Sequence, residues 1–477
     1  MDMNEDVSDR QCFNIDISES GFYQGKTDCH SFTRSDRNEN NEQLNGNTAF
    51  IDASSVYGSD PEIAMKLRTK ADGLMRLHEV GSCLPMRSQC NLLSDNPMER
   101  PHDMVAGDQR NNVQPALASM HTMFLNEHNR VAAGLRNKLV SNEHFDKLPL
   151  EEQDQLLYQE ARKVVAAEMQ NIVYSEYLPL ILGSASLNGH GLKLPNNIFG
   201  TTRYNRFVKP MIRNEFSTVA YRFGHTLVNG FYQPVGPPRT MDYPLKFLFF
   251  DTLEFVLGEK CTMWWTEIKG LIEQPMATAD TSVARDMTDF LFCKMRDGCK
   301  YGDDLVARNI QRGRDHGIPD YNTFREYAGL TKIPDMDSKP EEIVQDDWDN
   351  LRDTYEDVDQ IDAYSAGMAE TPLKDGVVGP TWAKIIGMQF KLLMDGDRFF
   401  FTHPASGNSE ERGLRARTKQ TIREQTLGDI VCANTNAEST RKHVMKSVGD
   451  HIACDSTERK PLNFSLIASD IIQFSLK

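Results

Sequence analysis

The sequence predicts a mainly α-helical protein built as one large domain. Apolar residues recur at intervals of three and four over several long stretches, whereas the period-two alternation typical of strands is rare. The chain has 477 residues, 39% of them hydrophobic, which is enough for a sizeable core. No internal repeat or low-complexity tract marks a domain boundary.

The helical periodicity places four helices along the chain. They are expected over residues 117–135, 151–172, 216–228 and 381–394. Glycine, proline and polar residues at 184–211 predict irregular loops. The acidic stretch at 334–362 predicts a solvated helix and loop at the surface.

Net charge excludes one class of partner. The chain carries a formal charge of −16 and has a pI near 5.3, whereas binding to a nucleic-acid backbone requires a basic face. The apolar run at 177–187 is too short to cross a bilayer, so we expect no membrane span. Small-molecule chemistry stays open.

The most informative residue is His225, in the segment Ala-Tyr-Arg-Phe-Gly-His-Thr-Leu-Val at 220–228. Asn309 lies 84 positions downstream and opens Asn-Ile-Gln-Arg-Gly-Arg-Asp-His-Gly at 309–317. A histidine that binds iron needs an acceptor for its other ring nitrogen, and the side-chain carbonyl of Asn309 is the expected acceptor. A neutral amide leaves the imidazole neutral as a ligand. An isolated histidine in this setting is more often a buried structural residue.

With these two segments in view, the chain resembles the animal haem peroxidases of the myeloperoxidase and peroxinectin type, from about residue 12 to about residue 466. Six further segments match in order, at 48–58, 106–110, 119–131, 157–165, 177–183 and 395–399. The resemblance implies a large, single-domain, helical fold with haem b between helices. It also implies a peroxidase that oxidises a small-molecule or halide donor with hydrogen peroxide, in response to oxidative stress.

The resemblance assigns roles to four residues around the haem. His225 is the expected iron ligand with Asn309 behind it, and Arg222 is the expected partner of a haem propionate. Arg110 is the expected cation that stabilises charge as the O–O bond breaks. The glutamate that forms a haem ester in mammalian relatives is replaced by Val113, so no ester is expected there.

The proton-shuttling histidine of the family is not found. It is expected upstream of Cys12, where this chain has eleven residues and no histidine. We therefore interpret residues 1–477 as a peroxidase domain that is incomplete at its N-terminus. His102 is a weaker substitute for the base. The alternatives are a catalytically impaired haem-binding or adhesion and scaffold relative, although no Arg-Gly-Asp occurs, or an incompletely folding product.

The resemblance also implies a calcium loop made by Thr48, Phe50, Asp52 and Ser54. Hydroxyl, carbonyl and carboxylate oxygens are the ligands that Ca²⁺ prefers. A further family carboxylate, beside the distal histidine, is absent from this sequence. An ordinary surface loop is the alternative.

Nine cysteines favour the oxidising compartments of the secretory pathway or the extracellular space, although no signal peptide is recognisable. The resemblance implies disulfides between Cys12 and Cys29 and between Cys432 and Cys454, and an odd number of cysteines remains. One glycosylation sequon begins at Asn463. A cytosolic protein with reduced cysteines is the alternative.

Overall fold

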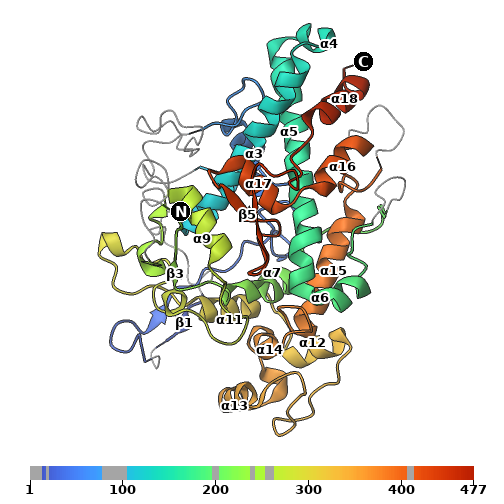
Figure 1. Ribbon diagram of the computed structural model, residues 1–477. Helices are drawn as coiled ribbons and strands as arrows, with labels where there is room; N and C mark the ends of the chain where they lie inside the picture. Colours follow the sequence, from blue (N-terminus) through green and yellow to red (C-terminus); the bar gives the residue numbers. More distant parts are fainter. Residues whose placement is uncertain are drawn as a thin grey trace.

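A computed structural model describes residues 13–17, 21–77, 105–195, 203–236, 242–252, 263–404 and 413–476. Within these residues the fold is mainly helical, as predicted (Figure 1). The strands form only two-stranded antiparallel pairs, which join β1 (Ile15–Asp16) to β2 (Cys29–His30), β3 (Phe231–Tyr232) to β4 (Tyr243–Pro244) and β5 (Ser439–Arg441) to β6 (His451–Ala453).

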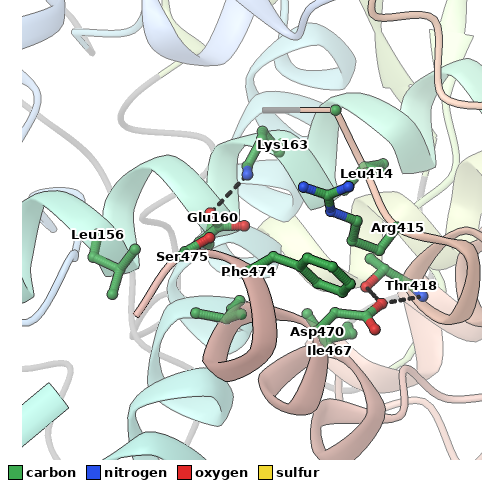
Figure 2. A pocket seen from close by; sticks show the side chains of 12 residues that line it. Leu156, Glu160, Lys163, Leu414, Arg415, Thr418, Ile467, Asp470, Phe474 and Ser475 are labelled. Carbon is green, nitrogen blue, oxygen red and sulfur yellow. Dashed lines mark hydrogen bonds and ion pairs between the residues drawn. The ribbon is translucent and has the colours of Figure 1, made fainter. Parts of the chain in front are cut away.

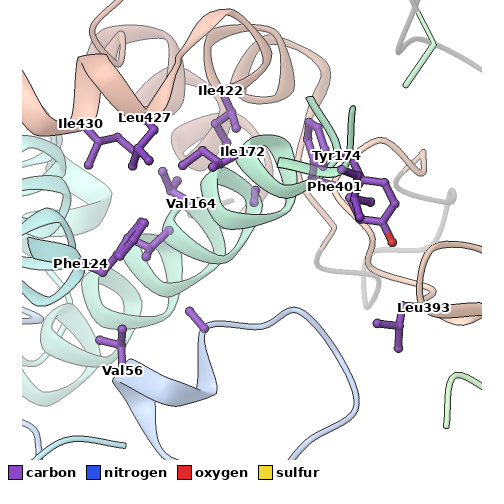
Figure 3. Packing of buried hydrophobic residues seen from close by; sticks show 14 of the residues in the cluster. Val56, Phe124, Val164, Ile172, Tyr174, Leu393, Phe401, Ile422, Leu427 and Ile430 are labelled. Carbon is purple, nitrogen blue, oxygen red and sulfur yellow. The ribbon is translucent and has the colours of Figure 1, made fainter. Parts of the chain in front are cut away.

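Two long helices form the centre of the molecule. They are α3 (Pro115–Leu139) and α5 (Leu150–Ile172), joined through the short α4 (Glu143–Asp146), and they confirm the first two predicted helices. Their apolar stripes meet in a core where Val131 and Val164 are fully buried. Each such side chain contributes about 1.5–3 kcal/mol relative to exposure. Figure 3 shows Phe124 and Val164 in this core.

The C-terminal helices pack against the two central helices, α3 and α5. α17 (Leu427–Asn434) and α18 (Phe464–Phe474) both pack on α3, and α16 (Ala416–Glu424) packs on α5. Gly134 has no room for a side chain because the ring of Phe464 lies against it. Segments more than 300 residues apart therefore share one core.

α5 continues into a second helix without a loop. A π-helical turn, η2 (Val173–Tyr177), leads into α6 (Leu178–Gly189). Gly183 has a φ of 68°, and a Cβ there would collide with the carbonyl of Lys374. Gly183 therefore kinks α6, and residues 184–189 beyond the kink are helical rather than irregular, which corrects the predicted start of that loop.

The prediction of one continuous helix over 216–228 is wrong. The chain forms α7 (Asn214–Thr218) and then a 3-10 helix, η3 (Ala220–His225), separated by Val219 with φ −128° and ψ −66°. The side chain of Val219 packs against Gly313 of α11 (Leu305–Asp315). Tertiary packing at this residue overrides the local helical pattern.

The fourth predicted helix is confirmed as α15 (Pro380–Gly396), with Trp382 and Ile386 buried. The acidic stretch holds α13 (Gln345–Thr354), but it is not wholly solvated. Trp348 is buried in a small separate core with Tyr321 of α12 (Tyr321–Ala328). The remaining helical elements are α1 (Ser54–Tyr57), α2 (Pro61–Lys66), η1 (Gln109–Asn112), η4 (Leu245–Phe247), α9 (Met263–Glu273), α10 (Arg285–Thr288), η5 (Met295–Asp297), η6 (Val358–Gln360) and α14 (Ala363–Ala369).

Two disulfides are formed within the described residues. Cys432–Cys454 is confirmed, and Cys293–Cys299 is also formed. Cys29 is an exposed, free thiol, so its implied pairing with Cys12 is wrong. The strand register sets Cys29 opposite Asp16, and Cys12 lies outside the described residues. In the described part of the chain, no helix is both long and apolar enough to cross a bilayer.

Candidate functional site

His225 and Asn309 are in contact, as the sequence predicted. His225 ends η3, and Asn309 projects from α11, whose first turn is capped by the Asp304 carboxylate through the amides of Val306 and Ala307. The side-chain amide nitrogen of Asn309 lies 2.9 Å from Nδ1 of His225. Asn309 is fully buried, and its helix α11 packs against α7 and α14 (Ala363–Ala369), which both also contact η3.

The orientation of the Asn309 amide differs from the prediction. Its carbonyl oxygen does not face His225 but accepts a hydrogen bond of 2.9 Å from Nη1 of Arg222. A guanidinium can only donate, so the oxygen must face Arg222 and the amide NH₂ must face His225. In this state Nδ1 of His225 is an acceptor, and a neutral imidazole carries its proton on Nε2.

The imidazole of His225 is held neutral. Burial and the charge of Arg222 lower its pKa to about 4. No described residue hydrogen-bonds Nε2. A metal binds the ring nitrogen that carries no proton, so His225 fits the haem-iron role that the resemblance implies in the other neutral tautomer, with its proton on Nδ1.

Arg222 is a cation without a counter-charge among the described residues. Its Nε donates to the Ser217 carbonyl at 3.1 Å, and it forms no ion pair there. Burial, aided by the charges of Arg312 and Arg110, lowers its pKa to about 10. A partly buried guanidinium of this kind favours an added anion, and a haem propionate supplies one.

Arg110 is not brought into contact with His225. It lies on η1, whose N-cap is Asp108, and its guanidinium is ion-paired to the Asp108 carboxylate. This hydrogen bond raises the pKa of Arg110, and 74% of its side chain is exposed. Val113, three residues on, packs in the apolar cluster that contains Tyr232 and Phe249, and it offers no carboxylate to a haem.

The four predicted calcium ligands converge on one another. The Thr48 hydroxyl lies 3.0 Å from Oδ1 of Asp52 and 3.4 Å from both the Phe50 carbonyl and the Ser54 hydroxyl. Oxygens gathered this closely fit part of the shell of a calcium ion. The described residues contain no group of three or more histidine, cysteine or acidic ligands, so the loop combines one carboxylate, that of Asp52, with neutral oxygens.

One acidic residue near this loop was missed by the sequence reasoning. Asp397 follows α15, and its pKa is raised to about 6 by burial and by the charge of Asp52. Gln170 bridges the two segments, because its amide donates to the Ile51 carbonyl at 2.9 Å and to Oδ2 of Asp397 at 3.4 Å. The matched segment at 395–399 was the available signal, but it carried no expected role.

The loop that carries Arg110 is packed directly on residues 54–58, which follow the predicted calcium ligands. The Asp108 amide donates to the Ser55 carbonyl at 3.1 Å. A Cβ on Gly107 would overlap the backbone of Ser54 and Gly58. His121 sits beside this contact, where burial lowers its pKa to about 4. The position of Arg110 therefore depends on residues 54–58 through two backbone contacts.

The other histidines have structural surroundings. His128 is buried between the Tyr57 hydroxyl at 2.8 Å and the Gly73 carbonyl at 2.9 Å. His316 contacts the Ser35 hydroxyl at 2.7 Å, and His30 pairs with Asp303 at 3.0 Å. His102 lies outside the described residues. The cavity of about 210 Å³ in Figure 2, between α5, α16 and α18, contains none of the predicted site residues.

The site combines a neutral histidine with a buried amide and with an arginine that has no counter-charge among the described residues. Helical haem proteins use sites of this kind. The chain belongs to the animal haem peroxidase family, whose model, described as "Animal haem peroxidase", matches residues 1–445. The sequence-based family assignment is thereby confirmed.

Individual relatives agree with this assignment. The chain is 34% identical to the peroxidasin homolog pxn-2 of Caenorhabditis elegans over 89% of its length, and 33% identical to mouse (Mus musculus) myeloperoxidase over 87%. It covers 32% and 56% of those two relatives. Among solved structures, peroxidase A from Dictyostelium discoideum matches with a TM-score of 0.67 and 28% identity, covering 86% of this chain and 76% of that one. A fatty acid alpha-dioxygenase of Oryza sativa, at 20% identity and TM-score 0.66, shares the fold.

Proposed function

We propose that this chain is a peroxidase that uses haem b and hydrogen peroxide to oxidise a small-molecule or halide donor, as part of a response to oxidative stress. The observation that carries the proposal is the contact of His225, Asn309 and Arg222, which leaves Nε2 of a neutral imidazole without a hydrogen-bond partner among the described residues. The family and its peroxidase relatives support the reaction type.

In this proposal His225 holds the iron and Arg222 pairs with a propionate. The haem, when bound, supplies the oxidising chemistry. An anion at Arg222 would release the carbonyl of Asn309, which Arg222 now occupies. Rotation of the terminal amide would then turn that carbonyl toward His225, so that Nδ1–H donates to it and Nε2 carries no proton. Arg222 is therefore assigned a second role, which is to set the tautomer of His225.

Arg110 is the proposed stabiliser of charge on the departing oxygen. Its guanidinium is exposed and tied to Asp108, so it is free to reorient toward an added anionic group at the cost of one surface ion pair. Such pairs contribute only about 0–1 kcal/mol. Calcium is proposed at Thr48, Phe50, Asp52 and Ser54, where it would stiffen the loop on which the Arg110 segment rests.

Secretion and glycosylation belong to the same proposal. The two disulfides suit an oxidising compartment. Asn463 is exposed at the N-cap of α18, and its side-chain oxygen accepts from the Leu466 amide at 3.2 Å. The helix cap uses only the side-chain oxygen of Asn463. The side-chain nitrogen, to which a glycan would be attached, takes no part in the cap.

The test is haem titration followed by an absorption spectrum before and after peroxide. The proposal expects one haem per chain, loss of that binding in His225→Ala, and no loss in His144→Ala. His144 is the matched control because it lies exposed on α4, far along the chain from the site residues. An unchanged haem spectrum in His225→Ala overturns the ligand assignment.

A second candidate is a haem-binding or scaffold relative with impaired catalysis. It is favoured by one observation, which is that His121, a described histidine beside Arg110, is buried and hydrogen-bonded to the backbone of Ser55. The same spectrum separates the two candidates, because the second expects haem binding without a rapid spectral change on adding peroxide.

A further inference from the structure

A second cavity lies away from the proposed haem site. It has a volume of about 480 Å³ and is formed by η2, α6, the end of α16, the start of α17 and residues 442–443. None of His225, Arg222, Asn309 and Arg110 lines it. Its size falls within the roughly 300–1,000 Å³ of small-molecule pockets.

Three cations line this cavity without a carboxylate partner. They are Lys193, Arg423 and Lys442, and none of them forms an ion pair within the described part of the chain. Arg423 is partly buried, and this burial lowers its pKa. A desolvated cation without a counter-charge is unfavourable, so an anion bound here would recover that cost.

Arg423 is also held in a fixed orientation. Its Nη1 donates to the Ser175 hydroxyl at 2.9 Å and to the side-chain oxygen of Asn171 at 3.3 Å. Ser175 belongs to the π-helical turn η2, and such turns occur frequently at functional sites. The guanidinium is therefore oriented before any ligand arrives.

The two acidic residues of the lining are already engaged. Glu176 accepts from the Leu427 amide at 2.8 Å and from Nδ1 of His443 at 3.3 Å. Glu424 accepts from the side chain of Gln420 at 2.8 Å on an exposed helix surface. These acids stabilise the walls, and the three unpaired cations remain for a ligand.

We propose that this cavity binds a small organic phosphate monoester. The phosphate carries close to two negative charges and three acceptor oxygens, which matches one oriented guanidinium and two flexible ammonium groups. A carboxylate has one charge and two oxygens, so it would leave two of the three cations without a counter-charge, whereas a phosphate monoester would leave one. The organic part would lie along Leu187 and Leu194. This site is independent of the peroxidase proposal.

The test is isothermal titration of the haem-loaded full chain with phenyl phosphate, with benzoate as the singly charged ring of similar size. We expect phenyl phosphate to bind and benzoate to bind at least roughly tenfold more weakly. Lys193→Gln/Lys442→Gln should weaken phenyl phosphate binding roughly tenfold or more. Lys446→Gln is the control, because Lys446 is exposed on the same segment as Lys442 but does not line the cavity.

A third variant tests the oriented guanidinium. Arg423→Lys keeps the charge but loses the planar fork, so it should weaken phenyl phosphate binding while leaving the haem spectrum unchanged. The proposal is overturned if phenyl phosphate gives no binding heat, if benzoate binds equally well, or if Lys446→Gln weakens binding as much as the double variant.

Discussion

At the scale of single residues, the sequence predicted that His225 and Asn309 are in contact, but it did not predict the orientation of the Asn309 amide. His225 and Asn309 were paired only through the resemblance, because nothing in local periodicity brings residues 84 positions apart together. The orientation of the Asn309 amide depends on Arg222, which takes its carbonyl oxygen. Arg222 and His225 compete as donors for the side-chain oxygen of Asn309. This competition depends on the tertiary structure, so a sequence motif cannot predict its outcome.

Asn309→Asp tests the electrostatics of this pair. The folded pKa of His225, about 4, lies below its ordinary 6.5, so the folded state binds fewer protons between these values. The His225 imidazole therefore lowers the free energy of unfolding as pH falls from about 6.5 toward 4, and it has no effect above about pH 6.5. A carboxylate at 309 should raise the pKa of His225 and lessen this acid-side loss. With haem bound, it should also lower the iron reduction potential.

NMR titration of His225 in the haem-free protein and a redox titration of the loaded protein measure these two shifts. The distant replacement Asn463→Asp provides a control for added negative charge. An unaltered His225 pKa in Asn309→Asp would mean that the contact does not exist in solution.

Val113 leads to a prediction about haem attachment. Its side chain packs in the apolar cluster of Tyr232 and Phe249, so no carboxylate is present to form an ester at this position. Haem bound to the chain should therefore extract fully into acidic organic solvent. Haem that stays with the denatured polypeptide would reveal a linkage elsewhere.

At the scale of elements, periodicity was sufficient where one helix packs against several neighbours. α3, α5 and α15 were predicted because each presents a continuous apolar stripe to the core. Periodicity failed over 216–228, where the backbone breaks at Val219 against α11. Periodicity also could not predict that the Arg110 segment packs on residues 54–58, because this contact uses glycine and backbone atoms, which carry no hydrophobic pattern.

Gly107→Ala tests that contact. The new Cβ would overlap the backbone of Ser54 and Gly58, so the two loops must separate. We expect a loss of about 1–3 kcal/mol in the free energy of unfolding and a smaller calcium-induced rise in Tm. Gly46→Ala is the control, because a Cβ there meets nothing within 4 Å and the residue lies just before Thr48. Equal behaviour of the two variants would contradict the coupling.

At the scale of the whole molecule, the fold class and the family were predictable, whereas the surfaces were not. A net charge of −16 gave no indication of a cavity lined by three cations that form no ion pair within the described residues. Those cations lie at positions 193, 423 and 442, so their proximity follows from the path of the chain rather than from any sequence pattern.

The last prediction concerns the rate of reaction with peroxide for a polypeptide of residues 1–477. Arg110 can stabilise charge on the departing oxygen but cannot accept a proton, since its guanidinium stays protonated. The buried imidazoles of His121 and His128 lie in structural contacts. Because general acid–base catalysis contributes roughly 10²–10⁴-fold, the haem-loaded polypeptide should react slower than an intact relative by about that factor. Stopped-flow spectroscopy measures this rate, and adding an upstream segment that carries Asp-His-Asp should restore it and tighten calcium binding. If residues 1–477 alone react as fast as an intact relative, another residue supplies the base, and His102 is the first to replace.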